Sequence, residues 1–185
     1  MAVAKKKRNT EDIAFVNFKK KLQKYLNSYE VKKVEKAYSI AKDAHSGQKR
    51  KSGENYINHP LDAASYLADY ELDHETIMAA ILHDVVEDTG VTLREVEDRF
   101  GGEIALLVDG VTKISELKYH SAEQRKAENF RKMILSMVKD IRVILIKFAD
   151  RLHNVSTLEF LPEKKQRRIA LETREVYAPL AHRLG

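Results

Sequence analysis

The chain has 185 residues, of which 33 are basic and 28 acidic, and it contains no cysteine. The length fits a single domain, and the lack of cysteine excludes both a disulfide framework and a thiolate metal site. No apolar run approaches the ~20 residues that a membrane-spanning helix needs, and no apolar stretch follows the basic N-terminus. The sequence therefore predicts a soluble, cytoplasmic protein without a secretory signal.

The excess positive charge is concentrated at the N-terminus, in Lys5, Lys6, Lys7 and Arg8. Without these four residues, 29 of the 33 basic residues remain against 28 acidic ones, so the rest of the chain is nearly neutral. We interpret residues 1–10 as a basic, flexible tail and residues 11–185 as the folded domain. Contact of this tail with RNA or another polyanion is an alternative interpretation, but a nucleic-acid-binding module is the weakest hypothesis for the body.

Helical periodicity dominates the first half of the chain. A helix is expected after Thr10, a candidate N-cap, and a second over about residues 31–45. The long polar loop "SGQKRKSGENYINHP" follows, and its last residue, Pro60, fits the first turn of the next helix. Further helices are predicted over about residues 61–70 and 73–90.

Capping residues precede helical patterns in the second half as well. They are Thr92 with Glu95, Ser121 with Gln124, and Asp140. The corresponding helices are a short one after Thr92, one over about 103–111, one from 121 to about 139, one over 141–155, and a last one after Pro162. Strand signals are nearly absent, and "RVILIKFA" is interpreted as a buried helix. The prediction is an all-α bundle of roughly eight to ten helices.

Ionisable residues occur in apolar surroundings at four places. His59 ends the polar loop, His83-Asp84 and Glu87-Asp88 lie within "ILHDVVEDT", and Asp150 lies within "VILIKFADRLHNV". Residues four apart on a helix lie one above the other, so His83 should stack over Glu87, and Asp84 over Asp88. A lone buried carboxylate such as Asp150 is costly unless it is paired or bound to a metal.

These positions predict a metal site with an acid or base one helical turn away. His59, His83, Asp84 and Asp150 form a mixed nitrogen and oxygen set, which favours Mn²⁺, Fe²⁺ or Mg²⁺ over structural Zn²⁺. The two adjacent acids alone would indicate only a solvated, charged edge. The Asp on a separate apolar helix and the His in a glycine-containing loop make a site the better interpretation. His153, one turn after Asp150, is interpreted as a structural partner, and the remaining histidines are discounted.

Six motifs in order carry a resemblance to a known family. They are "GQKRKSGENYINHP", "HDVVEDT", "LVDGVTK", "KAENFRKM", "IRVILIKFADRLHN" and "YAPLAHRLG". From about residue 30 to 185 the chain closely resembles the N-terminal hydrolase domain of the RelA/SpoT family of alarmone enzymes. An isolated "HD" pair is weak support, whereas this ordered series is specific.

The resemblance implies an all-helical HD fold that holds one Mn²⁺ ion and removes pyrophosphate from the 3′ position of (p)ppGpp, giving GDP or GTP. The implied metal ligands are His59, His83, Asp84 and Asp150. Glu87 and Asp88 are implied to activate the attacking water and to assist departure of the 3′ oxygen. The implied substrate-binding residues are Arg50, Lys51 and Ser52 at the guanine base, with Asn154 and Thr157 lining the nucleoside pocket. Asn55 departs from the family, whose members often have proline there.

The resemblance also bears on domain organisation. In long family members "YAPLAHRLG" leads into a synthetase domain, so we expect this chain to be a fragment of a bifunctional enzyme, with that synthetase domain as its partner. Two other hypotheses stay open. One is an HD phosphohydrolase with another nucleotide substrate, and the other is a (p)ppGpp-binding regulatory domain without turnover.

Overall fold

The computed structural model describes residues 13–115 and 139–184, and within these ranges the chain is helical. The one β feature described is an isolated bridge between Lys49 and Asn55 in the polar loop. A helix over residues 13–22 precedes the labelled elements. These are α2 (Ser28–Ala44), α3 (Asn58–Asp69), α4 (His74–Leu82), α5 (Val85–Asp88), α6 (Leu93–Phe100), α7 (Gly102–Ser115), α9 (Arg142–Ser156), the 3₁₀ turn η1 (Leu158–Phe160), α10 (Glu163–Glu172), the π-helical turn η2 (Thr173–Tyr177) and α11 (Ala178–Leu184). The predicted all-α class is confirmed.

Side-chain caps fix several helix starts. Thr92 and Glu95 form the predicted capping box of α6. The N-cap of α9 is Ile141 rather than the predicted Asp140, but Asp140 Oδ1 still accepts a hydrogen bond from the backbone N–H of Arg142, the first residue of α9, at 2.9 Å. A further capping box, Asn27 with Glu30, starts α2. The predicted cap at Thr10 and the predicted helix from Ser121 lie outside the described residues, as does the tail over residues 1–10.

The predicted single helix over residues 73–90 is wrong in one respect, because it is interrupted after Leu82. Asp73 caps α4 as a helix start, but a turn at His83 and Asp84 separates α4 from α5. The His83 ring donates through Nδ1 to the carbonyl oxygen of Ala80 at 2.6 Å. In a continuous helix that carbonyl would accept from the N–H of Asp84, so the side chain competes with the backbone there.

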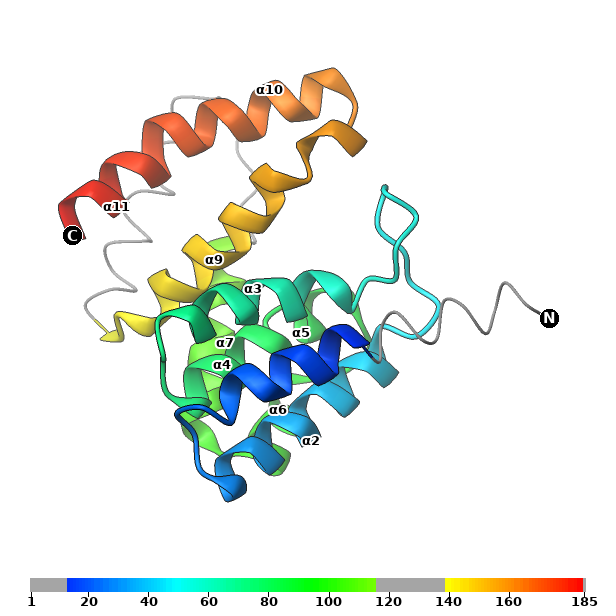
Figure 1. Cartoon of the computed structure of the whole chain (residues 1–185). Helices are drawn as coiled ribbons and strands as arrows, with labels where there is room; N and C mark the ends of the chain where they lie inside the picture. Colours follow the sequence, from blue (N-terminus) through cyan, green and yellow to red (C-terminus); the bar gives the residue numbers. More distant parts are fainter. Residues whose placement is uncertain (1–12, 116–138, 185) are drawn as a thin grey trace.

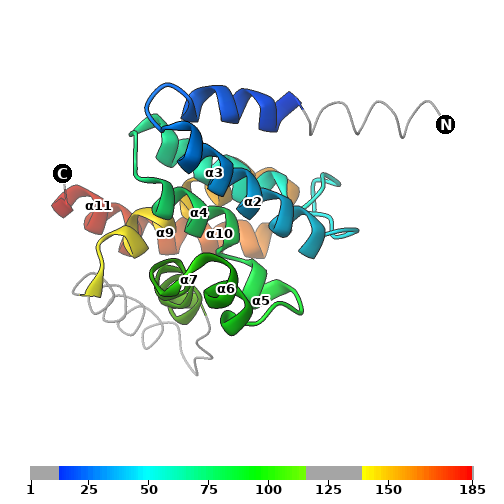
Figure 2. The same cartoon turned by 90° about the horizontal axis from the view of Figure 1, so that it is seen from below.

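The core surrounds α4, whose residues from Thr76 to Leu82 are all buried. Helices α2, α3 and α7 pack against α4, and α9 lies across α3 (Figure 1). From below, α5, α6 and α7 are seen to lie together on one side of the bundle (Figure 2). Two of the three elements that carry the predicted metal ligands, α3 and α9, therefore pack directly on each other beside the end of α4.

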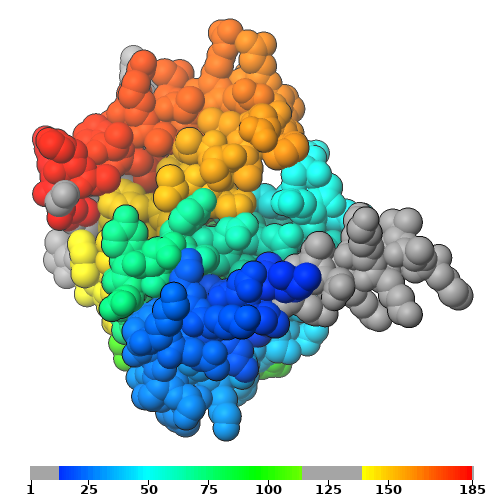
Figure 3. Space-filling model, viewed as in Figure 1, coloured from blue at the N-terminus to red at the C-terminus, as the bar shows by residue number. Residues whose placement is uncertain are grey.

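The last helices turn back along α9 (Figure 1). Arg151 of α9 pairs with Glu172 at 3.1 Å and lies over the ring of Tyr177 at 4.1 Å. In the space-filling view, the polar loop in cyan faces the chain around residue 160 in orange (Figure 3). No described helix combines the length and the apolar character needed to cross a membrane.

Candidate metal centre

Three separate elements bring His59, Asp84 and Asp150 together. His59 lies in the first turn of α3, Asp84 in the turn after α4, and Asp150 in the middle of α9. His59 Nε2 lies 3.2 Å from Asp150 Oδ1 and 3.5 Å from Asp84 Oδ2. Asp150 is buried, as the apolar sequence around it predicted. The long-range convergence expected from the sequence is therefore present.

His83 completes this cluster from the turn after α4. Its Nε2 atom lies 3.0 Å from Asp84 Oδ1 and 3.9 Å from Asp150 Oδ1. Because Nδ1 donates to Ala80, the neutral ring carries its lone pair on Nε2. This buried Nε2 atom has no hydrogen-bond partner of suitable geometry. A lone pair buried against two carboxylates needs a proton or a cation between them.

These residues fit a divalent cation. One ligand atom each of His59, His83 and Asp150 lies within 4.8 Å of the others, and Asp84 contacts both histidines. Two imidazoles and two carboxylates without a thiolate suit Mn²⁺, Fe²⁺ or a similar ion.

Charge in the cluster is balanced by protons and by a lysine. Burial alone would lower the pKa of His83, but the carboxylates of Asp84 and Asp150 raise it to about 9. Burial lowers the pKa of His59 and so keeps that ring available as a neutral ligand. Burial alone would raise the pKa of Asp150, but the Lys147 ammonium, together with the neighbouring His59 and His83, holds it well below its usual range.

Lys147 is a member of this site that the sequence reasoning did not single out. It lies one turn before Asp150 on α9, is only 6% exposed, and donates to Asp150 Oδ2 at 3.3 Å. Asp150 Oδ1 faces His59, so the lysine holds the carboxyl oxygen on the other side. A single lysine in an apolar run was the available signal, because burying an ammonium requires a paired anion.

Glu87 and Asp88 lie on α5 at the exposed edge of the cluster. Tyr56 donates its single hydroxyl hydrogen between Asp84 Oδ2, at 2.8 Å, and Asp88 Oδ2, at 2.7 Å. The predicted stacking of Asp84 over Asp88 is thus observed. Partial desolvation raises the pKa of Glu87, with Lys147 opposing the rise. Tyr56, which no motif or spacing in the sequence singled out, therefore joins two of the predicted site residues.

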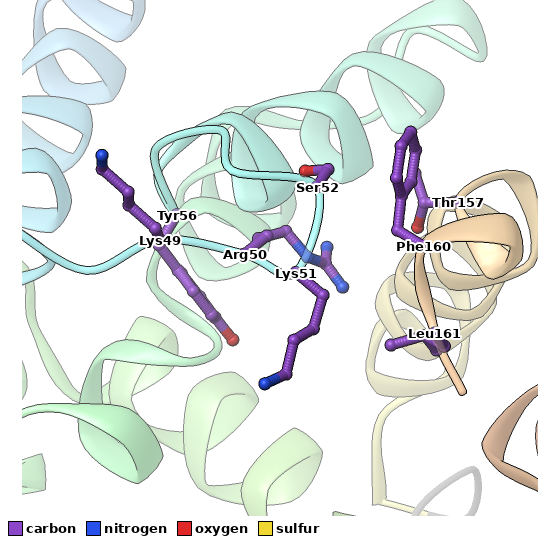
Figure 4. Close-up of a pocket in the computed structure, with 8 residues that line it drawn as sticks. All are labelled: Lys49, Arg50, Lys51, Ser52, Tyr56, Thr157, Phe160 and Leu161. Carbon is purple, nitrogen blue, oxygen red and sulfur yellow. The ribbon is translucent and has the colours of Figure 1, made fainter.

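A pocket of about 340 Å³ opens beside the cluster, between the polar loop and the end of α9 (Figure 4). The loop contributes cationic side chains and the other wall is partly apolar. Its lining residues are Lys49, Arg50, Lys51, Ser52, Tyr56, Thr157, Phe160 and Leu161. Four of the five predicted substrate-binding residues line it, and the fifth, Asn154, accepts a hydrogen bond from Arg50 at 2.7 Å.

The chain is similar to known proteins over most of its length. Residues 37–185 match the model of the HD domain family. The bifunctional (p)ppGpp synthase/hydrolase SpoT of Escherichia coli K12 is 54% identical over 171 residues, which cover 92% of this chain and 24% of that protein. A guanosine-3′,5′-bis(diphosphate) 3′-pyrophosphohydrolase of Aquifex aeolicus is 52% identical over 172 residues, with the same coverage. The chain therefore spans about a quarter of the length of these relatives, and its predicted resemblance to RelA/SpoT enzymes is confirmed.

A solved structure also resembles this fold. It is described as a metazoan ortholog of SpoT that hydrolyzes ppGpp, and it superposes with a TM-score of 0.65 at 29% identity. The match covers 82% of this chain and 85% of that one.

Proposed function

The chain belongs to the HD domain family, and we propose that it hydrolyses (p)ppGpp at the 3′ position, releasing pyrophosphate and leaving GDP or GTP. The observation that carries this proposal is the buried cluster of His59, His83 and Asp150 beside a pocket walled by loop cations. The activities for which the related proteins of Escherichia coli and Aquifex aeolicus are named support the substrate. We further propose that the chain acts as the hydrolase part of a longer bifunctional protein, whose synthetase domain is its partner.

In this proposal His59, His83, Asp84 and Asp150 hold Mn²⁺. When bound, this ion lowers the pKa of a water ligand and polarises a phosphoryl oxygen.

The chain's own residues supply the positioning and the proton transfers. Glu87, whose pKa is raised by partial desolvation, accepts a proton from the attacking water. Asp88, oriented by the Tyr56 hydroxyl, assists departure of the 3′ oxygen, which receives the proton that Glu87 has taken from the water.

The loop pocket binds the nucleoside end of the substrate. The guanidinium of Arg50 is planar and suits stacking on a purine, while its charge attracts a polyanion. Lys51 and Ser52 contribute from the same loop, and Thr157 with Asn154 from the end of α9. The apolar wall at Phe160 and Leu161 covers the base. In this proposal the base therefore binds in the loop pocket, and the 3′-pyrophosphate binds at the candidate metal centre beside Glu87 and Asp88.

The test is incubation of the protein with ppGpp and Mn²⁺, Mg²⁺ or a chelator, followed by quantification of GDP and pyrophosphate. We expect turnover with Mn²⁺ and none with chelator. Asp84→Ala should lose both metal binding and turnover, whereas Glu87→Gln should keep metal and lose turnover. Asp98→Asn, an exposed acid on α6, is the matched control and should behave as wild type. Binding of ppGpp without hydrolysis by the metal-loaded protein would instead indicate a regulatory domain, and a preference for a 5′-monophosphate would indicate another nucleotide substrate.

A further inference from the structure

The imidazole of His153 is contacted at one atom by two groups from different parts of the site. Its Nδ1 lies 2.8 Å from Nδ1 of His59 and 3.1 Å from Nη1 of Arg50. His59 belongs to the candidate metal centre, whereas Arg50 lines the loop pocket. His153 is buried between them on α9, one turn after Asp150.

The hydrogen-bond partners of His153 determine which of its nitrogens accepts. Its Nε2 lies 3.2 Å from the carboxylate of Asp62, which can only accept, so Nε2 carries the hydrogen. Nδ1 is then the acceptor, with one lone pair in the ring plane. An arginine can only donate, so Arg50 donates to this lone pair. His59 donates to it as well through Nδ1–H, which leaves Nε2 of His59 as the nitrogen that faces Asp150 and Asp84.

Arg50 is also connected to the carboxylate side of the cluster. Its Nη2 donates to Asn154 Oδ1 at 2.7 Å, and Asn154 Nδ2 donates to Asp150 Oδ1 at 2.6 Å. Both contacts of the Arg50 guanidinium therefore end on residues that orient a candidate metal ligand. Groups that orient a metal-bound imidazole typically change metal affinity by 10–100-fold when they are removed.

We propose that Arg50 couples the loop pocket to the metal centre through His153. This inference rests on the proposed function, because it takes His59 as a metal ligand. While Arg50 lies against α9, Arg50 and His59 share the single lone pair on Nδ1 of His153. A nucleotide that draws Arg50 onto its base leaves the His153 lone pair to His59 alone. The hydrogen bond from His59 to His153 then fixes the His59 ring and makes Nε2 of His59 a stronger ligand for the metal. Occupancy of the loop pocket thus tightens metal binding, and bound metal favours nucleotide binding to the same degree.

Substitutions in the nucleotide-free protein isolate this coupling from any direct contact between substrate phosphates and metal. Arg50→Met removes both donors but keeps a side chain over Tyr56, and it should bind Mn²⁺ about 3–10-fold more tightly than wild type, a fraction of the range for such orienting groups. Lys49→Met removes one positive charge from the same loop, at an exposed position, and should bind Mn²⁺ as wild type does. Asp62→Asn weakens the partner that orients His153 and should reduce affinity.

The Mn²⁺ dissociation constant is measured by isothermal titration for each variant, with circular dichroism as the check on folding. The double variant Arg50→Met/His153→Ala should lose the gain produced by Arg50→Met, because the shared acceptor is gone. If wild type binds no Mn²⁺, the proposed function itself fails. If wild type binds but Arg50→Met binds no more tightly, the coupling is wrong while the metal site stands. A gain that persists in the double variant, or that Lys49→Met reproduces, would be a general charge effect and would also overturn the coupling.

Discussion

Lys147→Met tests whether the buried lysine holds the candidate metal centre together. The ammonium lies 3.3 Å from Asp150 Oδ2, and the two residues are only 6% and 9% exposed. Methionine preserves most of the apolar stem and removes the charge. The buried carboxylate of Asp150 then loses the cation that holds its pKa down.

The expected loss of stability follows from this geometry. Removing one partner of a buried ion pair typically costs about 3–5 kcal/mol, because the other charge stays buried without compensation. Here Asp150 keeps its contact with His59 and has His83, whose pKa is raised to about 9, beside it. We therefore expect the lower end, about 3 kcal/mol. For a chain of this length each kcal/mol lowers the unfolding midpoint by roughly 2–4 °C, which gives a decrease of roughly 6–12 °C.

Thermal unfolding followed by circular dichroism, in the presence of chelator, measures this difference. Lys164→Met on α10 is the matched control, since Lys164 is exposed, and it should change stability by less than about 0.5 kcal/mol. Saturating Mn²⁺ should narrow the gap between Lys147→Met and wild type, because a cation held by Asp150 replaces the missing charge. A Lys147→Met protein no less stable than the control in chelator would refute the reasoning.

Three further predictions concern packing, positioning and pH. Gly110→Ala would place a Cβ 2.9 Å from Val143 Cγ2, and it should lower the unfolding free energy, measured with denaturant, by about 1–2 kcal/mol. In a Val143→Ala background, which removes the contacting methyl groups, Gly110→Ala should instead stabilise the protein, because alanine favours the helix more than glycine does. Tyr56→Phe removes the hydroxyl between Asp84 and Asp88 and should lower kcat roughly 10-fold or more with little change in KM. A rise in KM as large as the fall in kcat would contradict this positioning role. Since metal must displace the proton of His83, whose pKa is about 9, Mn²⁺ affinity measured by titration calorimetry should rise by up to about tenfold per pH unit from pH 6.5 to 8.5, and a flat profile would exclude His83 as a ligand.

Local patterns in the sequence predicted the helices well, because helix formation and capping depend on neighbouring residues. The capping box at Thr92 and the hydrogen bond from Arg142 to Asp140 both involve side chains within three residues of a helix start. The same rule would have found Asn27 with Glu30 at the start of α2. Asp150 was predicted as buried because a carboxylate within an apolar helix has few other places to lie.

Contacts between distant segments were harder to predict. Tyr56 meets Asp84 and Asp88 from 28 and 32 residues away, and no local spacing marks it. His153 was interpreted as a structural partner from its spacing to Asp150, but its contact with Arg50 spans 103 residues. Such pairings depend on how the polar loop folds over the ends of α3 and α9, and neither periodicity nor capping describes that.

The interruption between α4 and α5 connects the fold to the site. In a regular helix adjacent side chains diverge by about 100°, so His83 and Asp84 would not face each other. In the structure His83 Nε2 lies 3.0 Å from Asp84 Oδ1, and Asp84 has φ −95° and ψ −8°, a region in which many active-site residues lie. The turn that ends α4 thus makes the two neighbouring side chains converge on Asp150 and His59. Without a glycine or proline there, the side chain of His83 itself, through its bond to Ala80, helps to break the helix that carries it.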